Sequence, residues 1–355
     1  MNKILQILKL ILSPFPSFVD KSLFKYFKER KIQFADVGSS GGLKEEFYPL
    51  KPVTKIISFD PDNRAAIDNS SNVTNYRTGL WSRKEKMKLN LARFPDASSL
   101  YKPNAELTKY FPVIHNNHSI VQEGEIDLDA LDNLIDYEID FLKIDVEGAE
   151  KEILIGGANS LKNLLGLKIE VRFQEIYIGS PKFFEIHNYL ESIGLQLHHM
   201  QTNSWSREQS IYKFSNPSLI WADAYYVMNT DKFIQLIKEI ASEENRCEYI
   251  SKFYLILQSM GALEHLQIIQ ENVELLNETE FRYVLPKKLY FARTYFSLAK
   301  MMILLPFLFF GFLVSLPAKK LNFHFIVLIK KYAFAIGYLI RQFGGNDTKT
   351  GTITW

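Results

Sequence analysis

Two short runs rich in glycine and acidic residues each follow an apolar, β-type stretch of this 355-residue chain. The first run is DVGSSGG at residues 36–42, and the second is KIDVEGAE at residues 143–150. An open α/β sheet ends its strands in this way where it presents a ligand crevice. Together the two runs predict an active site that binds a nucleoside.

The segments around these runs alternate between β-type and helical patterns, as expected for a doubly wound sheet. The predicted strands are residues 32–37, 55–59, 73–80, 139–144 and 167–173. The predicted helices are residues 43–50, 61–69, 129–134, 149–165 and 181–193, and the fourth is interrupted or capped at Gly156 and Gly157.

Three further segments complete this pattern. Residues 82–138 break the alternation with extended runs at 86–91 and 120–126, and we expect them to form an insertion over the site. Residues 195–200 and 221–228 are expected to form a closing antiparallel strand pair. Beyond them, helical periodicity predicts helices at 231–240, 246–258 and 263–276.

The chain is longer than a usual single domain, so more than one part is expected. We divide it into an N-terminal helical segment at 1–31, an α/β domain at 32–229, an α-helical region at 230–285 and a basic apolar helical tail at 286–355. A hydrophobic fraction of 47% and a charged fraction of 23% are ordinary for a globular protein. The single cysteine, Cys247, excludes an intrachain disulfide and a zinc cluster built on thiolates.

The spacing of the first glycine run indicates which cofactor it accepts. The run does not give G-x-G-x-x-G, and no G-x-x-x-x-G-K-[ST] occurs, so a cofactor without phosphates is favoured. Asp60, at the end of the second strand, is placed to accept hydrogen bonds from both hydroxyls of a ribose. Asp36 either holds the cofactor's amino group or caps the turn. S-adenosylmethionine has that ribose and no phosphate.

At this point the chain resembles the FkbM-type S-adenosylmethionine-dependent methyltransferases. The motifs that carry the resemblance are DVGSSGG, FDP at 59–61, SSL at 98–100 and FLKIDVEGAE, within residues 34–228. The family implies a class I methyltransferase fold, which is a Rossmann-like, doubly wound, mostly parallel sheet with an antiparallel terminal strand pair, here followed by an α-helical C-terminal region. The cofactor contacts that we expect are Asp36, Gly38, Ser39, Gly41, Asp60, Pro61 and Gly79. Asp60 departs from the family, in which Glu is frequent at this position.

Two carboxylates, Asp145 and Glu147, sit where the central strand ends, beside the expected position of the methyl group. Either one could orient or deprotonate a hydroxyl acceptor, or else they only cap and stabilise the following helix. Glu170, in the next strand, is a third candidate catalytic carboxylate. It would allow a Mg²⁺ site, but the resemblance does not require a metal, so none is expected. Arg172 is predicted to form an ion pair with Glu170 or to bind an anionic substrate.

Other residues that could carry chemistry are two adjacent histidines, His198 and His199. They point to opposite faces if they lie in a strand, so at most one faces the site. A lone imidazole of this kind is more often structural than catalytic.

The two ends of the chain have apolar segments of their own. Residues 2–12 suit a retained amphipathic helix that packs on the core or lies on a membrane. After Glu280 the chain carries a formal charge of +10, against −8 for the residues before it. Residues 301–318 are uncharged and close to membrane-spanning length, but Pro306 and Gly311 break their regularity.

These features predict how the tail is used. We expect it to lie at an anionic membrane surface, with a buried helical hairpin as the alternative and no nucleic-acid partner. The chain is then a cytoplasmic, peripheral or monotopic protein at the inner face of a membrane. The predicted function is S-adenosylmethionine-dependent O-methylation of a glycan, glycolipid or other lipid-linked hydroxyl. The alternatives are a nicotinamide-dependent oxidoreductase and a non-catalytic membrane scaffold.

Overall fold

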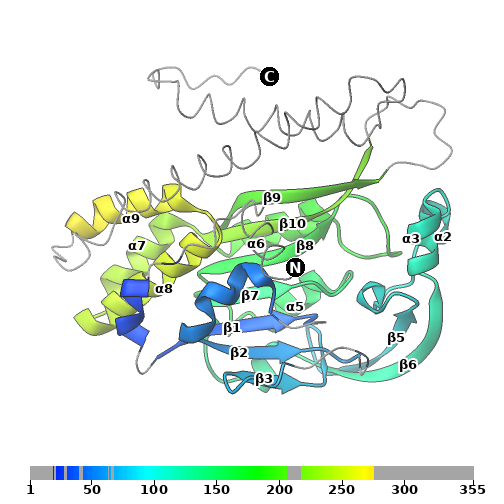
Figure 1. The fold of residues 1–355 in the computed structure, drawn as a ribbon, viewed down its shortest axis with the longest axis horizontal. Coiled ribbons are helices and arrows are strands. Elements are labelled where there is room, and N and C mark those ends of the chain that lie inside the picture. The colour runs from blue at the N-terminus through cyan, green and yellow to red at the C-terminus, as the bar shows by residue number, and fades with distance from the viewer. Residues whose placement is uncertain are drawn as a thin grey trace, which may run out of the picture. The chain divides into compact units, whose positions relative to one another are not determined.

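The structure is a computed structural model that describes residues 19, 21–27, 30–39, 43–62, 64, 68–205 and 217–275. These residues belong to one compact unit, Pro14–Val284 (Figure 1). The predicted N-terminal helix at 2–12 and the basic apolar tail at 286–355 lie outside the described residues. Within the ranges that the structure describes, no helix has the length and apolar character needed to cross a membrane.

A seven-stranded sheet in the order β3-β2-β1-β7-β8-β10-β9 forms the centre of this unit (Figure 1). Its strands are β1 (Ile32–Val37), β2 (Thr54–Phe59), β3 (Val73–Tyr76), β7 (Phe141–Ile144), β8 (Gly166–Arg172), β9 (Leu195–Trp205) and β10 (Ser218–Met228). The first five of these run parallel to one another, whereas β10 is antiparallel to both β8 and β9. This order confirms the predicted class I methyltransferase fold with its antiparallel terminal pair.

Helices cover both faces of the sheet, as adjacent residues of β10 show. Tyr225 lies 3.4 Å from Glu46 of the 3₁₀ helix η2 (Glu45–Val53), whereas the hydroxyl of Tyr226 lies 3.1 Å from His187 of α6 (Phe183–Ser192). Neighbouring strand residues point to opposite faces, so η2 and α6 lie on opposite sides. A further helix, α5 (Glu150–Gly156), joins α6 through Tyr189, and α8 (Glu243–Ser259) packs with η2.

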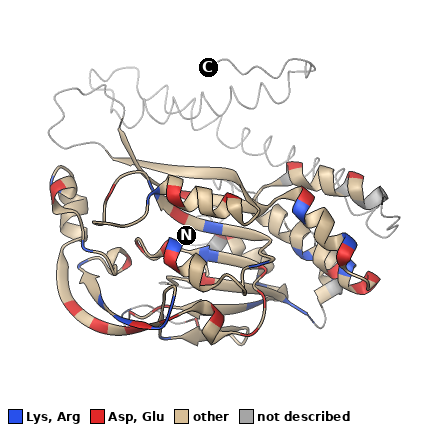
Figure 2. Ribbon diagram, turned by 180° about the vertical axis from the view of Figure 1, so that it is seen from behind, with Lys and Arg blue, Asp and Glu red and all other residues tan. Residues whose placement is uncertain are grey.

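Residues between β3 and β7 form a second, three-stranded sheet in the order β4-β6-β5. Its strands are β4 (Gly79–Leu80), β5 (Glu85–Ala92) and β6 (Ile120–Asp129), with η3 (Pro95–Ala97), α2 (Ala105–Thr108) and α3 (Pro112–Asn117) between β5 and β6. The predicted insertion is therefore present, but the single strand expected at 73–80 is divided between the two sheets. Figure 2 shows acidic residues along β6, where Asp127 and Glu123 pair with Lys86 and Lys88 of β5.

Two prolines change one predicted helix, and a glycine ends another where an interruption was expected. The helix predicted at 43–50 is the 3₁₀ helix η2, because Pro49 and Pro52 lack the N–H groups that an α-helix needs there. The helix predicted at 149–165 ends at Gly156, where an added Cβ would lie 2.1 Å from the carbonyl oxygen of Trp81. The described residues of the stretch 61–69 form no helix, and residues 63 and 65–67 lie outside the description.

Three helices follow the sheet as predicted, namely α7 (Thr230–Glu239), α8 and α9 (Leu263–Leu275). The middle one, α8, contacts η1 (Lys21–Phe27), η2 and β8. Its Lys252 ammonium lies 3.0 Å from Asp140, just before β7, and 3.2 Å from Glu248. This buried ion pair ties the helical region to the sheet, while the four-segment division of the chain stays a prediction.

Candidate active site

A cavity opens at the carboxyl ends of β1, β2 and β7 and holds about 900 Å³ of space, part of it open to solvent. The predicted site residues in its lining are Gly38, Asp60, Pro61, Gly79, Asp145 and Glu147. Asp36, Ser39 and Glu170 are not among the lining residues, and Gly41 lies outside the described residues. The roles given to these ten residues stay predictions.

The turn after β1 depends on Gly38, whose φ is 73°. An added Cβ there would lie 1.8 Å from the backbone oxygen of Asp145, so no other residue fits without displacing the second motif. The carbonyl of Gly38 accepts a 2.6 Å hydrogen bond from Lys143. This glycine therefore brings the two sequence motifs into direct contact, besides lining the cavity.

Asp36 and Ser39 have partners within the protein. The Asp36 carboxylate is buried and lies 3.3 Å from the Lys143 ammonium, which is also 3.7 Å from Asp145. Burial raises the pKa of Asp36 in spite of this cation. The Ser39 hydroxyl lies 2.5 Å from that of Ser58 in β2. Both residues thus brace the strand ends behind the cavity.

Asp60 follows β2 and lies in the cavity wall. Its Oδ1 accepts a hydrogen bond from the Asp62 backbone N–H at 2.9 Å, which holds the carboxylate against its own turn. Burial raises the pKa of Asp60. Apolar side chains of the second sheet, Leu80, Leu89 and Leu128, lie in the same lining. The cavity therefore joins an acceptor of hydrogen bonds to an apolar surface.

The turn after β7 is strained and is held by the SSL motif. Glu147 has φ 58°, an unfavourable conformation for a residue other than glycine, and Gly148 has φ 120°. The Ser99 hydroxyl donates a 2.5 Å hydrogen bond to the Glu147 carbonyl, and its oxygen accepts the Tyr101 N–H at 2.9 Å. Ser99 therefore fixes the backbone that presents the Glu147 carboxylate to the cavity.

Behind this turn a single buried guanidinium serves three carboxylates. Arg172 contacts Glu147 at 2.6 Å, Glu170 at 2.5 Å and Glu150 at 3.1 Å, and it lies over the Tyr177 ring. The predicted Arg172–Glu170 pair is confirmed, and the structure adds the other two acids. One cation cannot neutralise three carboxylates, so this cluster favours proton uptake.

The protonation of two members follows from that excess of acid. Burial is the largest cause that raises the pKa of Glu147, to about 7, with Asp145 adding to it and Arg172 opposing it. Burial and the Glu147 charge raise the pKa of Glu170 well above its usual range. Glu147 therefore titrates near neutral pH, and the surroundings of Glu170 favour its protonated form.

Asp145, Glu147 and Glu170 also have the spacing of a metal site, since one oxygen from each lies within 4.8 Å of the others. The Arg172 guanidinium, however, already contacts Glu147 and Glu170 and supplies the positive charge there. The Arg172 side chain therefore serves as the cation of this cluster. The geometry disfavours Mg²⁺, which prefers a set of oxygen ligands and waters.

Lys143 and Glu150 contact predicted site residues, although no role was predicted for either of them. Both lie inside the second motif, and for Lys143 the sequence does indicate a buried ion pair. Lys143 stands in the otherwise apolar strand FLKI, where all four residues are buried, and a buried ammonium requires a partner. Its partner is the buried Asp36 of the adjacent strand, paired in register with it.

Family comparison agrees with this geometry. Residues 44–197 match the family model described as the Methyltransferase FkbM domain. The matched segment carries the FkbM methyltransferase domain. The predicted resemblance to this family is thereby confirmed over residues 44–197. No curated protein matches the chain in sequence.

Solved methyltransferase structures are among the chains that match. The methyltransferase FkbM from Methylobacillus flagellatus KT is 18% identical with a TM-score of 0.32, and the match covers 56% of this chain and 43% of that one. The precorrin-6y C5,15-methyltransferase from Geobacter metallireducens GS-15 is 12% identical with a TM-score of 0.31, covering 59% and 85%. The chain thus spans less than half the length of the Methylobacillus protein.

Proposed function

We propose that this FkbM domain transfers a methyl group from S-adenosylmethionine to a hydroxyl group. The observation that carries the proposal is the cavity at the ends of β1, β2 and β7, which has Asp60 in its wall and Asp145 and Glu147 in the same lining. The carboxylate that would accept hydrogen bonds from the ribose therefore lines the same cavity as the two carboxylates that could act as the base. The bound cofactor would supply an electrophilic methyl group.

The residues present fit the nucleoside half of such a cofactor. Asp60 offers carboxylate oxygens to a ribose diol, and the apolar surface formed by Leu80, Ile126 and Leu128 suits an adenine ring. The turn at Gly38 has no side chain to obstruct the ligand. A dinucleotide is less well accommodated, because the 36–42 run lacks the glycine spacing that binds pyrophosphate.

Glu147 is the group that we assign to removing the acceptor proton. It lines the cavity, and with a pKa of about 7 it is available as a base near neutral pH. Arg172, at 2.6 Å, holds its carboxylate in place. Asp145 is oriented by Lys143 and is the alternative base.

Glu170 has a different role in this proposal. It is absent from the cavity lining and contacts Arg172 at 2.5 Å, so it positions the guanidinium and does not touch the acceptor. Methyl transfer to oxygen needs alignment and exclusion of water more than strong base catalysis. The strained turn held by Ser99 provides that alignment for Glu147.

For the acceptor, we propose a hydroxyl of a glycan, glycolipid or other lipid-linked molecule. The basic apolar composition of residues 286–355 supports an anionic membrane surface as the place of reaction. Flotation of the full-length protein with anionic and neutral vesicles at low salt tests this part. Failure to float with anionic vesicles would exclude the membrane surface without affecting the methyltransferase proposal.

The cofactor is tested by calorimetry of the full-length protein with S-adenosylmethionine, S-adenosylhomocysteine, NAD⁺ and NADP⁺. We expect saturable binding of the first two and none of the others. Binding of a nicotinamide cofactor in their place would establish the oxidoreductase alternative. Mass spectrometry of glycans and lipids from cells with and without the gene then identifies an acceptor by the mass of one methyl group. A non-catalytic scaffold would leave both sets of masses identical.

A further inference from the structure

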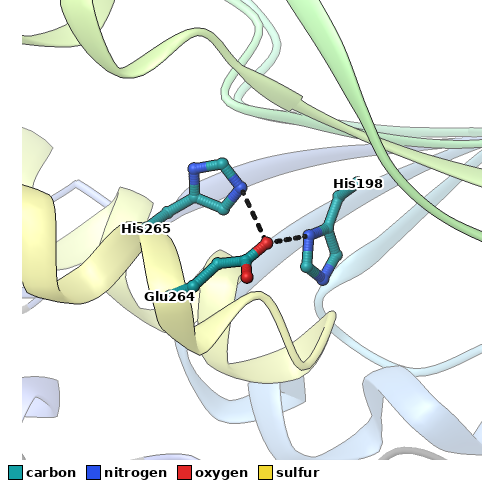
Figure 3. A group of neighbouring side chains, drawn as sticks. All are labelled: His198, Glu264 and His265. Carbon is teal, nitrogen blue, oxygen red and sulfur yellow. Dashed lines mark ion pairs between the residues drawn. The ribbon is translucent and has the colours of Figure 1, made fainter. Parts of the chain in front are cut away.

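Two histidines and a glutamate meet between the edge strand β9 and the helix α9 (Figure 3). None of the three is among the residues that line the cavity. Glu264 Oε1 lies 3.3 Å from His198 Nδ1 and 3.9 Å from His265 Nε2. One ligand atom from each residue falls within 4.8 Å of the other two. Figure 3 shows the carboxylate between the two rings.

His198 reaches this position through an irregularity in the strand. Tyr225 of β10 pairs with His199, but the next residue, Tyr226, pairs with Leu197, so His198 is the extra residue of a β-bulge. Bulges redirect a side chain and are common beside functional sites. Its Nδ1 is buried and makes no hydrogen bond, although the Glu264 carboxylate faces it.

The contacts of His265 fix which ring nitrogen carries the lone pair. Its Nδ1 lies 3.3 Å from the Thr230 hydroxyl, and its Nε2 lies 3.4 Å from the Gln196 amide nitrogen. The Gln196 carbonyl oxygen accepts from Asn229, which orients the amide so that its NH₂ group faces His265. Nδ1–H then donates to Thr230, and the lone pair of Nε2 accepts from the Gln196 amide, a contact that a bound metal ion would replace. Metal-binding histidines are held by this type of outer hydrogen bond. Glu264 is largely exposed, so solvent can reach the fourth side of the cluster.

We propose that His198, Glu264 and His265 bind a divalent transition-metal ion, with Zn²⁺ as the best match. Two imidazoles and one carboxylate, with an open position for water, form a known ligand set for Zn²⁺. Mg²⁺ and Ca²⁺ are disfavoured because they prefer oxygen ligands. The ion would fasten α9 to the sheet edge, so metal content would control how the helical region is docked.

The experiment uses the full-length protein, freed of metal with a chelator and titrated with Zn²⁺ and Mg²⁺ by calorimetry. We expect one Zn²⁺ per chain, no comparable Mg²⁺ binding and a higher melting temperature with Zn²⁺. Glu264→Gln and His265→Gln should each weaken Zn²⁺ binding at least about tenfold. His199→Gln and Glu271→Gln, on the same two elements, serve as matched controls and should bind as the parent does.

Glu264→Gln keeps the proposal falsifiable even if a histidine variant fails to fold, because this exposed side chain contributes little to packing. Circular dichroism of the metal-free variants establishes that they are folded. Replacement of Zn²⁺ by Co²⁺ should give the visible absorption of a tetrahedral site in the parent and not in Glu264→Gln. Absence of saturable Zn²⁺ binding, or equal binding by Glu264→Gln and Glu271→Gln, would overturn the proposal.

Discussion

Substitution of Asp60 by asparagine tests the ribose contact with little disturbance of the fold. Asn retains an oxygen that can accept the Asp62 N–H now bound at 2.9 Å, and it removes only the charge and one acceptor. Burial already raises the pKa of Asp60, so an uncharged group at this position does not add to the desolvation cost of folding. The melting temperature should therefore stay close to that of the parent.

The magnitude follows from the hydrogen bonds that the carboxylate would make to a ribose. A hydrogen bond to a charged group contributes about 1.5–3 kcal/mol. Loss of one such bond weakens binding about 10- to 150-fold, since each 1.4 kcal/mol is about tenfold. The assay is calorimetric titration of Asp60→Asn with S-adenosylhomocysteine, which lacks the reactive methyl group and so reports binding alone.

Asp62→Asn is the matched control because Asp62 lines the same cavity but has a partner elsewhere. Its carboxylate lies 2.6 Å from Arg64, which with the neighbouring hydrogen bonds lowers the pKa of Asp62. We expect a small change in cofactor affinity there. Equal affinities for Asp60→Asn and the parent, or equal losses in the two variants, would refute the assignment of Asp60 to the ribose.

Three further predictions concern the base, the helical region and the turn. If Glu147, with its pKa of about 7, is the base, kcat/KM should rise with pH through about pH 7, because only the ionised carboxylate accepts the proton; a flat profile over that range would contradict this role. Lys252→Met should cost about 3–5 kcal/mol in urea denaturation because it leaves Asp140 buried and unpaired; a loss below 1 kcal/mol would contradict the ion pair. Gly38→Ala should lower the free energy of unfolding by about 3 kcal/mol or more, because the strain of a positive φ, about 1–3 kcal/mol, adds to the clash of the new Cβ at 1.8 Å. Gly124→Ala, with open space around it, should melt as the parent does.

The order and type of most elements could be predicted because they depend on local pattern. The glycine turn, the strand-end acids and the closing strand pair are written in short stretches of sequence. A departure occurred where single residues override the pattern, as with Pro49 and Pro52 in η2. The end of α5 at Gly156 agrees with the interruption expected there. The break between β3 and β4 could not be predicted, since it depends on pairing of Gly79 with Leu128, far away in the chain.

The candidate site was predicted less completely than the fold. Six of its residues line one cavity, because strand ends are set by topology. Partners within the protein are set instead by register and by which side chains share a face. The pairing of Asp36 with Lys143 requires β1 to lie beside β7 in register, and the Arg172 cluster joins three separate elements. Neither follows from spacing along the chain.

The alternation of charged residues along β8 is one sequence pattern that does indicate part of the site. Lys168, Glu170 and Arg172 alternate along β8, so they share a face, although every residue of this strand is buried. Buried charges need partners, and Lys168 finds them in Glu46 at 2.8 Å and Asp223 at 3.3 Å. Because Glu46 lies in η2, which begins soon after the 36–42 run, this ion pair fixes the start of η2 against β8. Period-two charges in an apolar strand thus predict a charged layer, which here joins η2 to the turn after β7.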